Sequence, residues 1–278
     1  MRLIVILGFA FLFYSCQEEV ALELENRDKI PVIEGVWTDN PSENFVSVAY
    51  SRDYYDTLDN ELIPDALVQI EDLNNGGIVE FRYVGELGHY LPLNQQAAEI
   101  GHEYRLRVAL EGNEYSATGT TLEAPVLDSI TYEFKEERFF ADEGYYLTLY
   151  GKIPFNENNF YRLKLTRNDT LLNRRSDYFL FDDTFGSSIL NNGFELTGFT
   201  FEKEDKVKLQ MLRLNEGAYD YLNQLVNLLF NDGGLFSPPP ANPETNIRVS
   251  QGSGEVMGYF MTAPVVTRTI VIREEDAN

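Results

Sequence analysis

Apolar and polar residues alternate with a period of two in several short segments of this chain, and that pattern restricts the folds it can adopt. Examples are Phe45–Tyr50 and residues 66–71 (Ala-Leu-Val-Gln-Ile-Glu). Because successive side chains of a β-strand point to opposite faces of a sheet, alternation predicts strands with one face in a core. The 17 Tyr and 19 Phe are also typical of a β-rich protein. We therefore expect a mainly all-β fold.

Turn residues separate these segments at the spacing of hairpins. Asn-Asn-Gly-Gly at 74–77 and Glu-Gly-Asn at 111–113 each stand between two strand candidates. Seven or so short strands at this spacing predict an immunoglobulin-like β-sandwich over residues 30–125. Further strand candidates follow, so we expect a second β-sandwich over residues 126–278.

One segment of this second half has a helical period instead. Its apolar residues recur three and four positions apart, at Ala218, Tyr221, Leu222, Leu225, Leu228 and Leu229. This stripe predicts an inserted amphipathic helix over residues 216–230, with Asn215 as its N-cap. A Pro-rich loop at 236–243 follows the helix, and its prolines favour a stiff, extended backbone.

The amino terminus predicts export and lipid attachment. An apolar run at 3–14 is too short for a hydrocarbon core about 30 Å thick, which needs roughly 20 residues. It fits a signal peptide over residues 1–15. The run ends in Phe13-Tyr14-Ser15-Cys16, with a bulky apolar residue three before the cysteine and a small one just before it. We expect Cys16, the only cysteine, to be the lipid attachment site, carrying acyl chains such as palmitate. A buried core cysteine behind an ordinary signal peptide is the alternative.

Residues 16–29 then form a polar tether. Its 14 residues span at most about 45 Å, at roughly 3.3 Å per residue. Gln17, Glu18 and Glu19 resemble the surface-export signal of Bacteroidota lipoproteins, which implies an outer-membrane protein that faces the cell exterior. A solvated linker that happens to be acidic is the alternative.

Charge excludes one class of partner. The formal net charge is −23, and its acids are spread along the chain rather than gathered in a tail. Such a surface repels nucleic-acid phosphates, so we expect no nucleic-acid binding.

Several motifs together resemble the Bacteroidota outer-membrane lipoproteins of domain-of-unknown-function family 4249. They are Pro-Val-Ile-Glu-Gly at 31–35, Gly-His-Glu-Tyr at 101–104, residues 125–134, Ala-Tyr-Asp-Tyr at 218–221, the Pro-rich loop and Gly-Tyr-Phe at 258–260. The resemblance covers nearly the whole chain. It implies no chemistry, but such proteins look like partners of TonB-dependent outer-membrane receptors.

Catalytic and metal-binding patterns are weak, and we expect no enzyme and no cofactor. His102-Glu103 begins like a zinc-protease motif, but Leu106 stands where the second histidine belongs. His89 and His102 are better explained as strand-edge residues. Gly252-Ser253-Gly254 lacks the outer glycines of a nucleophile elbow and indicates a turn. Acids at 182–183 and 202–205 are solvated loops in our interpretation, with calcium binding as the alternative.

Three Asp-Ser/Thr-aliphatic triplets match the O-glycosylation site that Bacteroidota use on exported proteins. Their acceptors are Thr57, Ser129 and Thr170. The matches are short, so chance is the alternative explanation.

Two functional classes follow. The first is an accessory protein that captures cargo for, or caps, a TonB-dependent outer-membrane transporter. The second is a free-standing surface module, adhesin-like, that binds a glycan or a protein. Aromatic and proline side chains in loops supply contact area at interfaces. The candidates for partner binding are Tyr54, Tyr55, Phe139, Phe140, Phe236, Pro238, Pro239 and Pro240. Each of them has core packing as its alternative.

Overall fold

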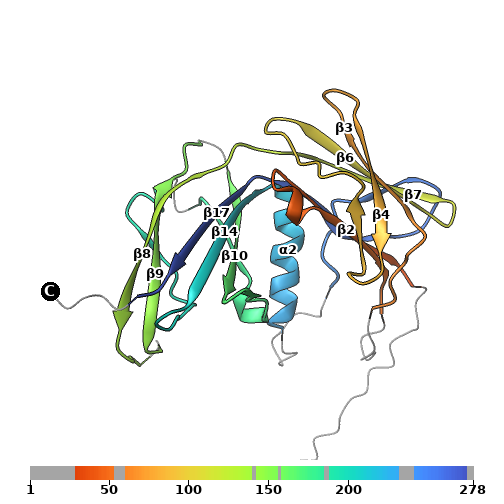
Figure 1. The fold of residues 1–278 in the computed structure, drawn as a ribbon. Coiled ribbons are helices and arrows are strands. Elements are labelled where there is room, and N and C mark those ends of the chain that lie inside the picture. Colours follow the sequence, from red (N-terminus) through yellow and green to blue (C-terminus); the bar gives the residue numbers. More distant parts are fainter. Residues whose placement is uncertain are drawn as a thin grey trace, which may run out of the picture.

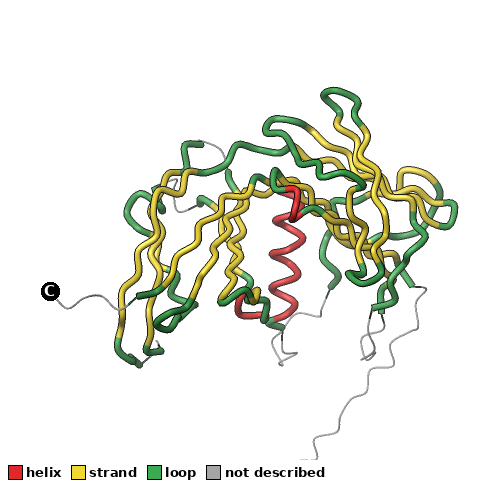
Figure 2. Tube along the Cα trace, viewed as in Figure 1, coloured by secondary structure: helices red, strands yellow, loops and turns green. Residues whose placement is uncertain are grey.

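The computed structural model shows a mainly β architecture with one α-helix in its described residues. This confirms the mainly all-β fold predicted from the sequence. The described residues are 29–52, 60–139, 142–155, 158–184, 188–231 and 241–273. Figure 1 shows the strands on both sides of the helix, and Figure 2 shows that strands and loops make up nearly everything else. No helix within the described ranges is long and apolar enough to cross a bilayer.

Nine strands form the first sheet, in the order β15-β7-β6-β3-β4-β5-β2-β1-β16. Their bounds are β1 (Pro31–Thr38), β2 (Phe45–Tyr50), β3 (Leu67–Asp72), β4 (Ile78–Val84), β5 (His89–Pro92), β6 (Glu103–Leu110), β7 (Asn113–Thr120), β15 (Arg248–Gln251) and β16 (Met257–Ala263). β16 runs parallel to β1, whereas the other pairings in this sheet are antiparallel. β15 and β16, which lie beyond residue 126, thus join strands from the expected first sandwich.

Alternation along the strands explains how this sheet encloses a core. In β6, Tyr104, Leu106, Val108 and Leu110 are buried and the residues between them are not. The buried side chains of β1 and β2 meet those of β3 and β6 in one cluster, so the sheet curls over itself. Gly35 on β1 makes the curl tight, because a Cβ there would lie 3.0 Å from the Leu106 side chain on β6.

Both predicted hairpins are present. The turn residues 74–77 lie in the 73–77 connection between β3 and β4, and β6 and β7 are joined by Glu111 and Gly112. The φ angles of Glu111 and Gly112 are 49° and 81°, which match the twist of a two-residue hairpin turn.

Two further sheets pack face to face in the second half. The first contains β10 (Phe160–Arg167), β11 (Thr170–Leu171), β12 (Phe179–Asp182), β14 (Lys206–Leu214) and β17 (Val265–Val271). The second contains β8 (Val126–Lys135), β9 (Gly144–Lys152) and β13 (Phe194–Glu195). Leu147 and Leu149 on β9 share a buried cluster with Leu163 on β10 and Leu209 on β14. β13 is only two residues long.

Helix α2 (Glu216–Leu229) confirms the predicted amphipathic helix. Its buried residues Ala218, Tyr219, Tyr221 and Leu222 pack against Leu212 and Leu214 of β14 and against Tyr259 and Met261 of β16. Figure 1 shows the helix between the two β-rich halves. The helix thus packs between the second-half strand β14 and the first-sheet strand β16.

Asn215 occupies the N-cap position but does not cap the helix with its side chain. Its Oδ1 accepts the backbone N–H of Thr262 at 3.0 Å, and its Nδ2 donates to the carbonyl of Phe260 at 3.2 Å. The residue therefore ties the start of α2 to β16, which corrects the role that the sequence suggested.

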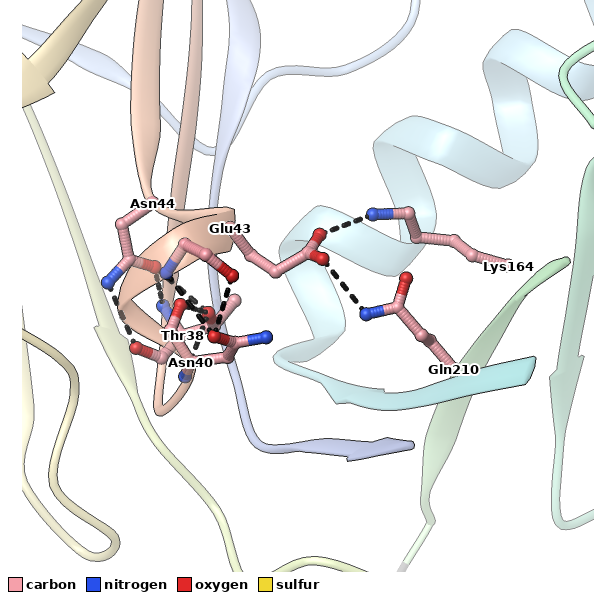
Figure 3. Close-up of polar contacts among 7 residues, drawn as sticks. Thr38, Asn40, Glu43, Asn44, Lys164 and Gln210 are labelled. Carbon is pink, nitrogen blue, oxygen red and sulfur yellow. Dashed lines mark hydrogen bonds and ion pairs between the residues drawn. The ribbon is translucent and has the colours of Figure 1, made fainter. Parts of the chain in front are cut away.

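A polar cluster joins the two halves on another side (Figure 3). It is built on the 3₁₀ helix η2 (Pro41–Glu43), in the β1–β2 connection. Asn44 holds this connection in place, because its Oδ1 accepts the backbone N–H of Thr38 at 2.7 Å. Glu43 then reaches across to β10 and β14, where Lys164 Nζ lies 2.7 Å from its carboxylate and Gln210 Nε2 donates to it at 2.9 Å.

Candidate functional site

One of the predicted partner-binding residues can be placed. Phe139, just after the end of β8, is 92% exposed. An aromatic side chain so accessible to solvent is available to a partner rather than part of the core. The remaining predicted residues lie outside the described ranges: Tyr54, Tyr55, Phe140, Phe236, Pro238, Pro239 and Pro240, together with Cys16, Gln17, Glu18 and Glu19 of the lipid site and export signal.

The described elements nearest these segments end on one side of the molecule. Figure 1 shows the start of β1, the end of β2, the β8–β9 turn and the C-terminal end of α2 all on its lower side. Pro31 and Tyr50 are direct partners across β1 and β2, so the polar tether joins the body beside the end of β2. We call this the tether-side end. The flanks of the segments that the sequence nominated for partner binding thus face the same side of the molecule, with the β8–β9 turn at the left of the view, α2 in the middle and the β1 and β2 ends at the right.

A cavity of about 670 Å³ opens at the tether-side end. Residues 29–31, where the described chain begins, form one wall, and residues 253–255 form another. Tyr50 and Tyr115 contribute aromatic surface, and Glu111 and Glu255 contribute carboxylates. The cavity is therefore acidic and aromatic, which suits polar or cationic groups better than phosphates.

Acids shape the electrostatics of this cavity. Burial raises the pKa of Tyr50, and the hydrogen bond and charge of Glu111 raise it further. The Tyr115 hydroxyl has a raised pKa for the same two reasons, burial first and then Glu111. Lys29 at the rim forms an ion pair with Glu61. Both tyrosines therefore stay protonated at neutral pH.

The wall at 253–255 is fixed by the β6–β7 hairpin. Asn113 Oδ1 accepts the backbone N–H of Ser253 at 3.1 Å. Gly252 and Gly254 have φ angles of 93° and 117°, so the segment is a turn rather than the strand-to-helix elbow of a serine hydrolase. The interpretation of Gly252-Ser253-Gly254 as a turn is thus confirmed by its backbone.

Two predicted glycosylation acceptors lie on exposed positions. Ser129 stands on β8 and Thr170 begins β11, directly after a turn at Asn168 and Asp169. Thr57 lies outside the described residues. Glycosylation itself stays a prediction.

Neither histidine belongs to a metal site in the described part of the chain, where no group of three or more His, Cys, Asp or Glu is placed to hold a metal ion. His102 Nδ1 lies 2.8 Å from Asp72 Oδ2, and its Nε2 lies 3.5 Å from Glu99. His89 stacks on Phe45 with ring centroids 4.7 Å apart. Asp72 was not singled out in the sequence, because its partner is 30 residues away.

The acidic runs considered for calcium have protein partners instead. Asp183 Oδ1 accepts the backbone N–H of Asn159 at 3.0 Å. Arg167 Nε lies 2.7 Å from Asp205, and Arg167 Nη2 lies 3.1 Å from Glu202. These carboxylates therefore stabilise loops between strands.

Comparison with known proteins gives a family but no activity. The model of a domain of unknown function, DUF4249, matches residues 17–269. No curated protein matches the sequence. Among solved structures, the chicken interferon gamma receptor alpha chain is 8% identical, with 67% of this chain and 89% of that chain covered and a TM-score of 0.17. A TM-score this low supports no conclusion about fold or function.

Proposed function

From the premise that this chain belongs to the DUF4249 family of unknown function, we propose that it is a surface-exposed lipoprotein of the outer membrane. Cys16 carries the lipid, and the body binds a TonB-dependent transporter as an accessory protein that captures cargo or caps the channel. Its role is binding, not catalysis.

One observation carries this proposal: the flanks of the segments nominated for partner binding face the same side of the molecule as the start of β1, where the tether joins the body. A lipid on Cys16 keeps this end within about 45 Å of the membrane, given the 14-residue tether. A transporter in the same membrane is therefore within reach of Phe139 and the neighbouring segments. Contact with the lipid surface itself is disfavoured, because a net charge of −23 is repelled by anionic headgroups.

Site-specific photo-crosslinking tests the proposal. A photoreactive phenylalanine analogue at position 139, in the lipidated full chain on intact cells, should capture a TonB-dependent barrel identified by mass spectrometry. The same analogue at Ile100 serves as the matched control. Ile100 is 44% exposed, but it lies beside the start of β6 in the first sheet, whereas position 139 follows β8 in the three-stranded sheet.

Co-purification extends the test to a second segment that the sequence nominated for partner binding. A tagged lipidated chain should retain the barrel in mild detergent, and the Tyr54→Ala/Tyr55→Ala and Phe139→Ala variants should retain less, whereas Ile100→Ala should not differ from the wild type. Equal capture at positions 139 and 100, or no barrel with a correctly lipidated surface protein, would contradict the proposal.

The second candidate function is a free-standing surface binder of a glycan or a protein. The observation that favours it is the cavity of about 670 Å³ lined by Tyr50, Tyr115, Glu111 and Glu255. The two functions are compatible in one protein, but only the first requires a barrel partner.

A further inference from the structure

The same tripeptide, Asn-Asn-Gly, occurs twice in the chain, at residues 74–76 and at residues 191–193. An asparagine that precedes glycine can lose its side-chain amide without an enzyme, because glycine has no Cβ to keep its backbone nitrogen away from the asparagine Cγ. Asn75 and Asn192 have the same residue before them and the same residue after them, so their intrinsic reactivity is matched. Any difference between them in the folded protein must therefore come from the structure around them.

Deamidation of such an asparagine takes two steps. Hydroxide removes the proton of the glycine nitrogen, that nitrogen bonds to the asparagine Cγ, and the bond from Cγ to Nδ2 breaks, so that ammonia leaves. Water then opens the resulting succinimide ring at one of its two carbonyl carbons. Attack at the side-chain carbonyl gives aspartate, whereas attack at the main-chain carbonyl gives isoaspartate, whose backbone is longer by one methylene group. The reaction consumes only water.

Hydrogen bonds hold Asn75 in the β3–β4 turn. Its Nδ2 donates to Asp72 Oδ2 at 2.9 Å, and its Oδ1 accepts the N–H of Gly77 at 2.7 Å. The N–H of Gly76, whose nitrogen would attack, donates to the carbonyl of Asp72 at 2.8 Å. Asp72 is itself fixed, because its Oδ2 lies 2.8 Å from His102 Nδ1. The leaving group and the nucleophile are both engaged, and deamidation has to break both of their bonds.

Asn192 lacks this protection. It is exposed, as Asn75 is, but its side chain has no hydrogen bond to another described residue. The N–H of Gly193 reaches only the carbonyl of Leu190, at 3.4 Å, which is longer than the usual N–H···O bond. Exposure to water therefore does not distinguish the two asparagines, whereas hydrogen bonding does.

Buried leucines fix the chain on both sides of Asn192. Leu190 and Leu196 are fully buried, and each of them makes a backbone hydrogen bond to β9. Between them, Gly193 lies so close to β9 that a Cβ there would be 2.8 Å from the ring of Tyr150. An added backbone methylene and a new carboxylate at position 192 should therefore strain this turn and loosen β13, the two-residue strand that follows it.

We propose that Asn192 is a site of spontaneous deamidation in the folded protein, and that Asn75 is protected by the turn that contains it. The product accumulates with the age of each molecule. It adds a negative charge at the edge of the three-stranded sheet, where β13 pairs with β9, and loosens that edge in the oldest molecules first. The proposal depends neither on lipid attachment nor on a transporter partner.

Peptide mapping tests the proposal. The purified full chain is kept in mildly alkaline buffer, and samples are digested at intervals. Mass spectrometry measures deamidation separately in the peptides that contain position 75 and position 192. Breaking two hydrogen bonds before the reaction slows it by about tenfold. We therefore expect Asn192 to deamidate at least about tenfold faster than Asn75 in the folded chain. In urea, where the turns are unfolded, the two rates should become similar.

Matched variants assign the effect to the hydrogen bonds. Asp72→Ala removes the acceptor of the Asn75 side chain, so it should raise the rate at Asn75 several-fold and leave the rate at Asn192 unchanged. Asn192→Gln should stop deamidation at that position, because glutamine would have to close a larger ring. Asn75→Gln is its control and should leave the rate at Asn192 unchanged. Circular dichroism checks that each variant is folded.

Thermal unfolding measures the consequence for the fold. Aged wild-type protein should unfold at a lower temperature than fresh protein, whereas aged Asn192→Gln should keep the value of its fresh form. Four results would overturn the proposal: equal or faster deamidation at Asn75 in the folded chain, a difference that persists in urea, an unchanged rate at Asn75 in Asp72→Ala, and equal loss of thermal stability in aged Asn192→Gln. None of these results bears on the crosslinking test at position 139.

Discussion

Glu43 and Lys164 are 121 residues apart in the chain, and Lys164 Nζ lies 2.7 Å from the Glu43 carboxylate. Gln210 occupies the second carboxylate oxygen from the neighbouring strand β14. One acidic side chain of the β1–β2 connection therefore fixes the first sheet against two strands of the second half. Both charged side chains are about four-fifths buried, at 19% exposure for Glu43 and 21% for Lys164.

Lys164→Met should therefore lower the free energy of unfolding by about 1–3 kcal/mol, since it leaves a largely buried carboxylate without its charged partner. Lys206→Met is the matched control on the adjacent strand. Its ion pair with Asp169 is exposed on both sides, so its loss should cost less than about 0.5 kcal/mol. Urea denaturation of both variants measures the difference. Equal losses of unfolding free energy in the two variants would show that the Glu43–Lys164 contact stabilises the fold no more than an exposed ion pair does.

The same carboxylate predicts a pH dependence. Burial alone would raise the pKa of Glu43, but the hydrogen bonds from Lys164 and Gln210 outweigh burial and lower it below 4.5. A lowered pKa gives stability that is present above pH 4.5 and is lost as the pH falls through the folded-state pKa. Glu43→Gln should remove that part of the acid dependence while it lowers stability at neutral pH. An unchanged slope of stability against pH would contradict this.

His102 and Asp72 should titrate as a pair. The hydrogen bond that His102 donates to the Asp72 carboxylate raises the pKa of His102 above 6.5. Burial raises the pKa of Asp72, but His102 and the backbone N–H groups of Asn74 and Asn75 together outweigh burial and lower the pKa below 3.8. The pair thus stabilises the fold between these limits, and its contribution is lost above the His102 pKa and below the Asp72 pKa. In Asp72→Asn, NMR titration should find the His102 pKa lower than in the wild type.

Gly258 is expected to tolerate no side chain. Its φ is 108°, and a Cβ there would lie 1.9 Å from the carbonyl oxygen of Ile33, its partner on β1. Gly258→Ala should destabilise the protein by at least about 3 kcal/mol. Gly198→Ala is the control, because no atom lies within 4 Å of a Cβ at that position. Thermal unfolding of the two variants should differ clearly.

Asn215→Ser distinguishes two roles of Asn215: capping helix α2 with its side chain, and bridging the start of α2 to β16. Serine is as good an N-cap as asparagine, so a capping role predicts no loss. Serine cannot replace both bonds to the Thr262 N–H and the Phe260 carbonyl, so bridging predicts a loss of about 1–2 kcal/mol. Chemical denaturation decides between the two roles.

Cys16→Ala should abolish membrane attachment. A chain without the acceptor thiol should appear in the soluble fraction and incorporate no labelled palmitate, whereas the wild type should incorporate label and resist extraction by salt. Retention of label in Cys16→Ala would show that lipid attachment occurs elsewhere.

Local patterns predicted most of the elements. The hairpins at 74–77 and 111–113 and the helix at 216–230 were predictable, because turn residues and a helical stripe act over a few positions. β5, β11, β15 and β16 were not predicted, since these strands are short or lack clear alternation. Gly258-Tyr259-Phe260 was noted as a motif, but its place in a sheet depends on β1, more than 200 residues earlier.

Contacts between residues that are far apart in the chain could not be predicted from the sequence. Nothing near Glu43 in the sequence indicates that its ion-pair partner is Lys164. Phe139 was predictable as an exposed aromatic because charged residues surround it in a turn.

The parallel pairing of β1 with β16 also determines when this protein can fold. Phe260 of β16 is fully buried in the same core as Ile33 of β1, so that core stays incomplete while the chain is being made or exported. The edge of β1 remains open until residue 263 has emerged, and unpaired edges invite wrong partners. Closing so distant a contact is slow. Premature termination near the C-terminus would therefore unfold the beginning of the protein rather than its end.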